Sequence, residues 1–388
     1  MKSKGIKQEN LTSVHNADNT VIVNRGMKPR ENFLRLVSGK TPAWVPFTMD
    51  IGGSEGFTTA VQKRFEEETG AEDPAEYFDY DLRVVSLHRG FGGTNPRRWH
   101  PEAPASTEFD EWGIGHWAGG ARDTYERMFP PLAGLDSVEA VNSFPEPIVD
   151  VGDTPEKVRA LHDRGYPVIG YAGSIYEWSW WLRGMEQFMV DLLADPAYAS
   201  AVIARVAGFT RRLALATAAA GIDVLSFYDD AGSQAGMQIS PELWRSFVKP
   251  AWKGVLDAVR LRHPSTVFFL HSCGNIEAIV PDIVELGFHI LHPIQPECMD
   301  APALKRTWGH RIIPCATLGA QRTLSLSTAE EVRLETLRVM DVMAWDGRAI
   351  VCPSNRIQPE TPWENIVAFA RTARDHANRF TASSPRLP

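Results

Sequence analysis

The fold is decided by the stretch Thr266-Val267-Phe268-Phe269-Leu270-His271-Ser272-Cys273-Gly274. Its first five residues are β-branched, aromatic or aliphatic, which predicts a buried strand, and the glycine and polar residues that follow predict the turn that ends it. His271 and Cys273 therefore stand at the carboxyl end of a strand, where α/β folds build their sites. An imidazole and a thiol at this spacing are also a sound chelating pair for a metal such as zinc.

Further apolar runs on both sides of this stretch have the length and composition of strands. With Val267–Leu270 they make eight: Trp44–Met49, Leu82–Leu87, Pro167–Tyr171, Val224–Tyr228, His289–Leu291, Arg311–Pro314 and Ala349–Val351. Most are followed by a helical pattern, and strands that alternate with helices imply a parallel sheet. The sequence therefore predicts an α/β fold, a (β/α)₈ barrel of the TIM type.

Helical spacing of apolar residues is clear between the strand runs. It predicts helices at Ile175–Leu193, Ala199–Ala219, Pro241–Leu261 and Ile276–Leu286. Thr328-Ala-Glu-Glu331 is a capping-box pattern for a helix that reaches about Trp345. Thr361-Pro362 with Glu364 predicts a similar start for the last helix.

One segment interrupts the alternation of strands and helices. Residues 92–147 are rich in Gly, Pro and Trp, and Glu108–Ile114 has the pattern of short hairpin strands. We predict a hairpin-rich insertion after the second strand, either above the catalytic face or as a surface elaboration without a role in catalysis. Residues 1–25 are predicted to be a flexible N-terminal tail, and residues 26–388 a single barrel domain.

Composition excludes several classes of function. The formal net charge of −8 argues against nucleic acid as the main partner, because phosphate binding needs a basic face. No apolar stretch approaches the ~20 residues of a membrane span, and the polar N-terminus lacks the apolar centre of a signal peptide. Four cysteines in 388 residues do not form a disulfide framework and are expected to be reduced thiols or metal ligands. We expect a cytoplasmic protein, and a homodimer stays open.

The residues just past the predicted strands are the candidates for the site. In a barrel they converge on one face, so we expect substrate contacts from that face. The candidates are Asp50, Tyr171, Trp178, Tyr228, Gln295 and Asn355. His88, His116 and His292 are further candidates for proton transfer, although a single histidine is more often structural.

Two local clusters have a functional and a structural interpretation. Asp229 and Asp230 follow the fourth strand and are predicted to orient substrate or transfer a proton; the alternative is a helix-capping acid and an ion-pair partner. The aromatic group Tyr176, Trp178, Trp180 and Trp181 follows the third strand. It fits a pocket wall for an apolar substrate, but also the core or an oligomer interface.

Five segments together carry a family resemblance. They are Asp229–Gln234, Ile239–Trp244, His271–Ile276, Leu291–Gln295 and Ile357–Ile366. With them the chain resembles the uroporphyrinogen decarboxylase superfamily, and within it the branch of cobalamin-linked methyltransferases. The resemblance runs from about Pro29 to the last helix and implies a (β/α)₈ barrel, in agreement with the strand count.

The methyltransferase branch holds zinc with a His-x-Cys pair and a distant third residue. His271 and Cys273 match the pair, whereas the usual third position, a cysteine or histidine, falls on Asn355. Cys352, one short loop step earlier, is the predicted third ligand, and Cys315 at the end of the preceding strand is the alternative. Loss of the metal also stays open.

The resemblance implies a zinc-dependent methyltransferase that acts with a separate corrinoid protein, since no cobalamin-binding Asp-x-His-x-x-Gly segment is present. The residues Thr48–Gly56 lack the arginines that hold substrate propionates in true uroporphyrinogen decarboxylases. The expected methyl donor is small, with O-demethylation of a methoxylated aromatic as the specific expectation. The alternatives are a metal-free decarboxylase of a smaller acid and a ligand-binding barrel that has lost its chemistry.

Overall fold

The computed structural model describes residues 14–15, 21–22, 26–52, 56–118 and 127–380. Most of the predicted N-terminal tail lies outside the described residues; within it, β1 (Val14–His15) and β2 (Val21–Ile22) pair antiparallel. Among the described residues, no helix is long and apolar enough to cross a membrane.

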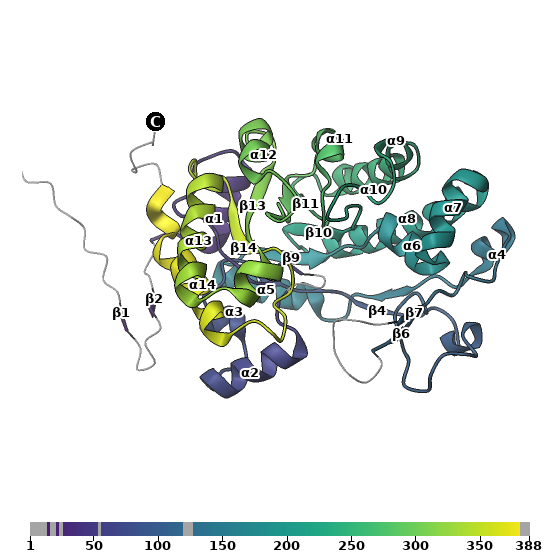
Figure 1. Ribbon diagram of the computed structural model, residues 1–388, viewed down its shortest axis with the longest axis horizontal. Coiled ribbons are helices and arrows are strands. Elements are labelled where there is room, and N and C mark those ends of the chain that lie inside the picture. The colour runs from purple at the N-terminus through teal and green to yellow at the C-terminus, as the bar shows by residue number, and fades with distance from the viewer. Residues whose placement is uncertain (1–13, 16–20, 23–25, 53–55, 119–126, 381–388) are drawn as a thin grey trace, which may run out of the picture.

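A parallel sheet forms the centre of the molecule (Figure 1). Its seven strands lie in the order β14-β13-β12-β11-β10-β9-β3. Their bounds are β3 (Arg83–Val84), β9 (Val168–Tyr171), β10 (Val224–Tyr228), β11 (Val267–His271), β12 (Ile290–His292), β13 (Ile313–Leu318) and β14 (Ile350–Pro353). Each overlaps a predicted run, and the order follows the chain, as a barrel of the TIM type requires.

The predicted first strand closes the gap between the two end strands. Phe47 makes a parallel bridge to Val351 of β14, and its carbonyl accepts a hydrogen bond of 2.8 Å from the N–H of Asp81, just before β3. The predicted (β/α)₈ fold is therefore confirmed: the seven strands of the sheet and the Phe47 segment, which comes first along the chain, together make eight.

Helices surround the strands (Figure 1). They are α1 (Pro29–Val37), α2 (Thr59–Thr69), α3 (Pro74–Tyr77), α5 (Thr154–Arg164), α6 (Tyr176–Arg183), α7 (Met185–Ala194), α8 (Pro196–Ala219), α9 (Pro241–Leu243), α10 (Lys249–Arg262), α11 (Val280–Leu286), α12 (Ala301–Trp308), α13 (Ala329–Met343) and α14 (Trp363–Asp375). The capping box of Thr328 and Glu331 is present at the start of α13. In contrast, Thr361 does not cap α14, whose N-cap is Pro362.

Two predicted helices are broken in the structure. Ile175–Leu193 divides at Gly184 into α6 and α7. Pro241–Leu261 becomes α9, a π-helical turn at Trp244–Val248, and α10. Pro250 lies at the start of α10, and a proline removes an intrahelical donor and clashes with the preceding turn, so an irregular turn before it is expected.

The predicted insertion is confirmed as a hairpin-rich segment. It begins after β4 (His88–Gly90) and ends before β8 (Ile148–Asp150), and these two strands pair antiparallel. Between them lie a three-stranded antiparallel sheet and α4 (Val138–Ser143). The sheet contains β5 (Glu108–Phe109), β6 (Gly115–Trp117) and β7 (Arg127–Phe129).

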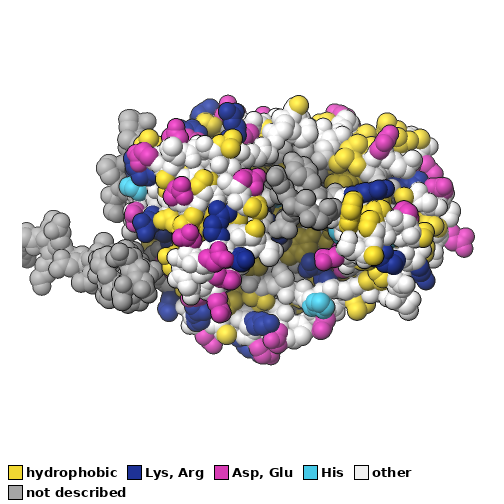
Figure 2. All heavy atoms as spheres, turned by 60° about the horizontal axis from the view of Figure 1, so that its bottom comes forward, with side chains coloured by type: hydrophobic (Ala, Val, Ile, Leu, Met, Phe, Trp, Pro, Cys, Tyr) yellow, Lys and Arg dark blue, Asp and Glu magenta, His cyan; other side chains and the backbone are white. Residues whose placement is uncertain are grey.

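The barrel interior is a packed core. Inward-facing side chains such as Val224, Phe269 and Ile350 form one buried cluster, and Phe33 and Leu36 of α1 belong to the same cluster. A larger cluster fills the layer between the strands and the surrounding helices. The space-filling view shows a hollow on one face of the molecule, with a hydrophobic floor and charged side chains of both signs around it (Figure 2).

Candidate metal centre and adjoining cavity

Three side chains stand in a row at the carboxyl ends of neighbouring strands. The parallel register places Tyr228 of β10 beside His271 of β11, and His271 beside His292 of β12. The Tyr228 and His271 rings stack with centroids 4.4 Å apart. On the other side, His271 Nδ1 lies 2.8 Å from His292 Nδ1. Strand register therefore determines the orientation of the central imidazole.

Glycines bring the loops after β10 and β11 into backbone contact. A Cβ on Gly274, whose φ is +83°, would lie 2.4 Å from the backbone carbon of Gly232, and one on Gly232 would lie 2.6 Å from the carbonyl oxygen of Cys273. Only glycine at both positions permits this approach. The approach allows the Cys273 N–H to donate to Asp230 Oδ1 at 2.7 Å.

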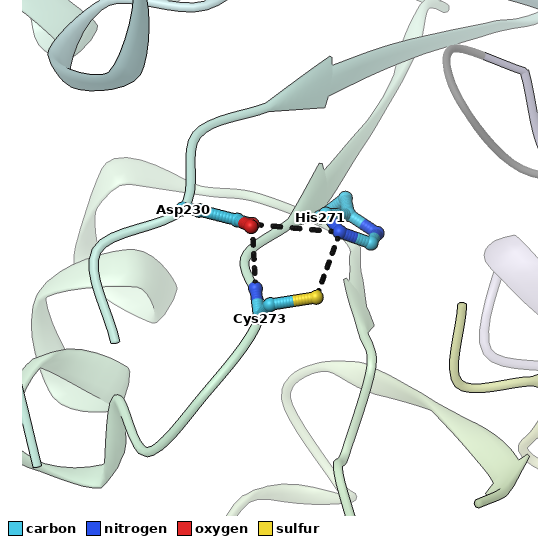
Figure 3. A group of neighbouring side chains, drawn as sticks. All are labelled: Asp230, His271 and Cys273. Atoms are coloured by element: carbon cyan, nitrogen blue, oxygen red, sulfur yellow. Dashed lines mark hydrogen bonds and ion pairs between the residues drawn. The ribbon is translucent and has the colours of Figure 1, made fainter. Parts of the chain in front are cut away.

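Asp230, His271 and Cys273 form the candidate metal group (Figure 3). One ligand atom from each lies within 4.8 Å of the other two. His271 Nε2 is 3.3 Å from Cys273 Sγ and 3.5 Å from Asp230 Oδ1. Ligands around tetrahedral zinc are separated by roughly 3.3–3.6 Å, given Zn–N and Zn–S bonds of about 2.0 and 2.3 Å. The donor set and its spacing therefore fit a zinc ion.

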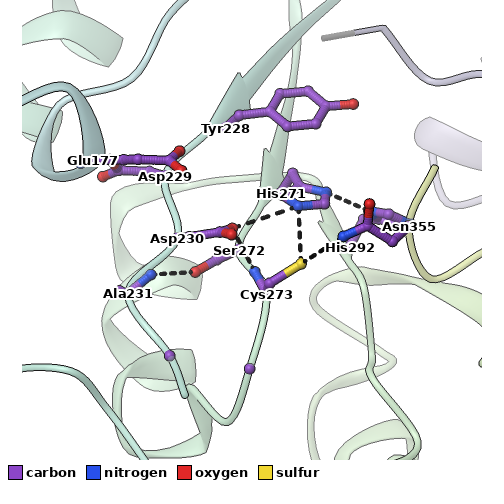
Figure 4. Close-up of polar contacts among 12 residues, drawn as sticks. Glu177, Tyr228, Asp229, Asp230, Ala231, His271, Ser272, Cys273, His292 and Asn355 are labelled. Carbon is purple, nitrogen blue, oxygen red and sulfur yellow. Dashed lines mark hydrogen bonds and ion pairs between the residues drawn. The ribbon is translucent and has the colours of Figure 1, made fainter. Parts of the chain in front are cut away.

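The hydrogen bonds of His292 determine the tautomer of His271 (Figure 4). His292 Nε2 donates to the carbonyl of Pro353 at 2.9 Å, so neutral His292 accepts at Nδ1 from the Nδ1–H of His271. Burial lowers the pKa of His271 to about 3, which keeps the ring neutral. Its Nε2 lone pair therefore faces Asp230 and Cys273. An imidazole lone pair and a carboxylate oxygen at 3.5 Å repel each other unless a proton or a metal ion lies between them.

Neighbouring groups act on both acidic members of the group, the Asp230 carboxyl and the Cys273 thiol. Burial raises the pKa of Asp230, and the N–H of Cys273 acts in the opposite direction. Asn355 Nδ2 donates to Cys273 Sγ at 3.3 Å, while Asn355 Oδ1 accepts from the Arg356 N–H. Such a donor stabilises a thiolate. Asn355 thus lies beside the group as a hydrogen-bond donor to the sulfur.

The structure does not bring Cys352 or Cys315 into this group. Both thiols are fully buried in the cluster that fills the barrel interior. Burial raises the pKa of Cys352 well above its usual value, and hydrogen bonding to Cys315 acts in the same direction. Asp230, and neither of these cysteines, is the third member of the group with His271 and Cys273, and Cys352 as a metal ligand stays a prediction.

The Asp229 carboxylate accepts hydrogen bonds from groups that hold the start of α6 in place. Its Oδ1 accepts from Ser174 Oγ and from the N–H groups of Ile175 and Glu177, and its Oδ2 accepts from Trp252 Nε1, all within 3.1 Å. These contacts match the capping alternative, because they satisfy donors at the start of α6. A catalytic role for Asp229 stays a prediction.

A cavity of about 280 Å³ adjoins the candidate metal group. Six of the predicted site residues line it: Tyr171, Trp178, Tyr228, Asp230, His271 and Asn355. Among the predicted substrate contacts, Asp50 and Gln295 are not part of the lining. Asp50 accepts a hydrogen bond from the N–H of Gly52, and Gln295 accepts one from the N–H of Gly274, which positions the loop after Cys273.

Two further lining residues were candidates from the sequence: His116 for proton transfer, and Trp181 as part of the aromatic group. Sequence reasoning missed Ser86, Arg89, Asp110, Glu111 and Glu177, and two of these belong to the insertion. The signal for Glu177 is its position as a single acid within the aromatic stretch Tyr176–Trp181. Burial raises the pKa of Glu177 well above its usual value, and the negative charges of Asp230 and Asp229 act in the same direction. Asp110 and Glu111 of the insertion carry no comparable signal in their neighbouring residues.

The fold and the site define a TIM-type barrel with a candidate metal group at its strand ends. The methyltransferase from Methanosarcina mazei has a similar structure, with a TM-score of 0.62, 17% identity, and coverage of 90% of this chain and 99% of that one. The family model for uroporphyrinogen decarboxylase (URO-D) matches residues 127–376, more than half of the chain. The protein therefore belongs to the URO-D family.

Two curated relatives match part of the chain. The methylcobamide:CoM methyltransferases MtaA of Methanosarcina barkeri and of its strain Fusaro are 28% and 27% identical over 156 residues. The matched region is 40% of this chain, and it spans 42% of the length of each relative.

Proposed function

We propose that this protein is a zinc-dependent methyltransferase that moves a methyl group between a small substrate and the corrinoid of a separate partner protein. The observation that carries the proposal is the cluster of Asp230, His271 and Cys273 beside a cavity at the strand ends. Similarity to methylcobamide:CoM methyltransferases supports the corrinoid partner and the reaction class.

The residues of the group have separate tasks in this proposal. His271 Nε2, Cys273 Sγ and a carboxylate oxygen of Asp230 would hold the ion, and the cavity would deliver the substrate to it. Bound zinc would act as a Lewis acid on the substrate heteroatom that loses or gains the methyl group. His292 keeps the Nε2 lone pair of His271 toward the ion, and Asn355 supports the Cys273 thiolate.

The decarboxylase alternative has less support from the charges of the cavity. Arg89 is the one Lys or Arg among the described lining residues, and its Nε donates to Glu111 at 2.7 Å. A carboxylate substrate would therefore meet a guanidinium that already has an anionic partner. We retain this alternative, and that of a binding barrel without chemistry, as outcomes of the test.

The test is the metal content of protein purified without a histidine tag and reconstituted with zinc. We expect near-stoichiometric zinc in the wild type and in Cys352→Ala and Cys315→Ala. His271→Ala, Cys273→Ala and Asp230→Asn should lose it. Loss with Cys352→Ala but not with Asp230→Asn would replace Asp230 by Cys352 in the ligand set.

Methyl transfer is then followed with free cobalamin in place of the partner's corrinoid. Reduced cobalamin and candidate methyl donors, or methylcobalamin and acceptors, should give the absorbance change of cobalt methylation or demethylation with the wild type and not with Cys273→Ala. A folded wild type that binds no zinc would reject the proposal.

A further inference from the structure

The described lining of the cavity next to the candidate metal group holds four carboxyl groups but a single Lys or Arg, which is Arg89. One of its four carboxyl groups has a permanently charged partner within the lining, since Glu111 pairs with Arg89 at 2.7 Å. Asp110 and Asp230 lie 3.0 and 3.5 Å from the imidazoles of His116 and His271. Glu177 has no basic side chain beside it among the described lining residues that these pairs include.

Asp230 and the Cys273 thiolate would together neutralise a dication bound at the candidate metal group. Glu177 would then be the acid on the wall that the metal ion does not compensate. Glu177 lies in the first turn of α6, where a helix favours negative charge, and its own N–H donates to Asp229. The fold therefore holds a carboxyl group at this position whose ionised form has no basic side chain from the described lining to compensate its charge.

Aromatic rings make up much of the remaining wall. Tyr171, Trp178, Trp181 and Tyr228 all line the cavity. The guanidinium carbon of Arg89 lies 4.7 Å from the centroid of the Tyr171 ring, so one of these rings already carries a cation. Aromatic faces combined with a carboxylate are the usual means of recognising ammonium groups. A volume of about 280 Å³ suits a small molecule.

From this combination we infer that the cavity binds a small organic cation with an ammonium group. Glu177 and the aromatic wall hold the ammonium end, and a heteroatom at the other end of the molecule faces Asp230, His271 and Cys273. As a statement about the substrate of methyl transfer, this inference rests on the proposed function. It takes the place of the methoxylated aromatic donor that the sequence suggested, since an uncharged donor would leave Glu177 without a partner.

Calorimetric titration of the zinc-loaded full chain with three probes tests the inference. The probes are choline, its uncharged carbon isostere 3,3-dimethyl-1-butanol, and the anion 4-methoxybenzoate. We expect choline to bind at least tenfold more tightly than the isostere. Equal binding of choline and the isostere, or binding of 4-methoxybenzoate alone, would overturn the inference.

Variants of Glu177 assign the preference to this site. Glu177→Gln should remove the preference for choline over the isostere. Glu177→Asp keeps the carboxyl group and should retain at least half of the logarithm of the ratio between the two dissociation constants. Glu186→Gln changes an exposed acid on α7 and should leave the preference unchanged. A preference that persists in Glu177→Gln would contradict the assignment.

The two proposals fail in distinguishable ways. Methyl transfer from an uncharged or anionic substrate, with no preference for cations, rejects the inference and leaves the proposed function standing. Selective binding of choline by a protein that holds no zinc and transfers no methyl group rejects the proposed function and leaves the cation site standing.

Discussion

His292 illustrates how a single side chain outside the metal group determines what the group can bind. We expect His292→Ala to weaken zinc binding by roughly 10–100-fold, because His271 loses the acceptor for its Nδ1–H and with it the fixed direction of Nε2. Competition with a chromogenic chelator measures this change. His289→Ala, which alters the histidine just before β12 whose Nδ1 accepts from the Phe268 N–H, is the control. Equal affinities of the two variants would show that His292 has no part in positioning His271.

Asp50 couples the stability of the fold to pH. Burial raises its pKa from 3.8 to about 6, so the folded state favours the protonated carboxyl. This contribution to stability is present at low pH and is lost as the pH rises from about 4 through 6. Because the side chain is partly exposed, we expect Asp50→Asn to recover about 1–2 kcal/mol at pH 7.5, less than the full shift implies.

Urea unfolding of the wild type and Asp50→Asn between pH 4 and 8 measures this effect. The Asn side chain can still accept the hydrogen bond from Gly52, so the difference isolates the charge. The variant should show the flatter pH dependence, and parallel curves would contradict the prediction.

At the level of elements, Gly184 separates α6, which carries the aromatic stretch, from α7. Gly184 has φ 91° and ψ 135°, a combination that side-chain-bearing residues rarely adopt. We expect Gly184→Ala to lower the free energy of unfolding by about 1–3 kcal/mol. The cost comes from the backbone, because a Cβ would meet nothing closer than 3.6 Å.

Gly254 in the middle of α10 is a matched control for this prediction. A Cβ there meets nothing within 4 Å, and its φ is not in the left-handed region. Gly254→Ala should therefore stabilise the protein by about 0.5–1 kcal/mol. Thermal unfolding of both variants gives the comparison, and a neutral Gly184→Ala would show that the helix can continue through this position.

For the whole molecule, Asp81 joins the two ends of the barrel. Its buried carboxylate accepts from Trp44 Nε1 at 2.9 Å, from the Phe47 N–H at 2.7 Å and from Arg374 Nη1 at 2.7 Å. These donors come from the first strand segment and from α14. Asp81→Ala would leave Trp44 Nε1 and the Phe47 N–H without their acceptor, while Arg374 would keep its ion pair with Asp79 at 2.6 Å. Because unsatisfied buried donors are costly, the substitution should lower the free energy of unfolding by about 3–5 kcal/mol.

Chemical denaturation tests the role of Asp81, with Asp81→Asn as the control that keeps an acceptor. Asp81→Asn should cost clearly less than Asp81→Ala, since the hydrogen bond to the Phe47 N–H can remain. Equal effects would mean that the charge, and not the hydrogen bonds, holds the two ends of the barrel together.

Sequence patterns determined the eight strand positions, the hairpin insertion and the placement of His271 and Cys273 at a strand end. These features depend on local periodicity and on glycine turns, and both can be read from neighbouring residues. The break at Gly184 escaped detection because the apolar spacing continues across it, whereas the backbone does not.

Only the tertiary structure decided which side chain completes the candidate metal group with His271 and Cys273. Asp230 joins them because Gly232 and Gly274 allow two loops to meet, while Cys352, nearer to the predicted place along the chain, points into the barrel core. The insertion adds Asp110, Glu111 and His116 to the cavity over a long sequence distance. Strand register and loop packing set these neighbours, and neither leaves a pattern in the local sequence.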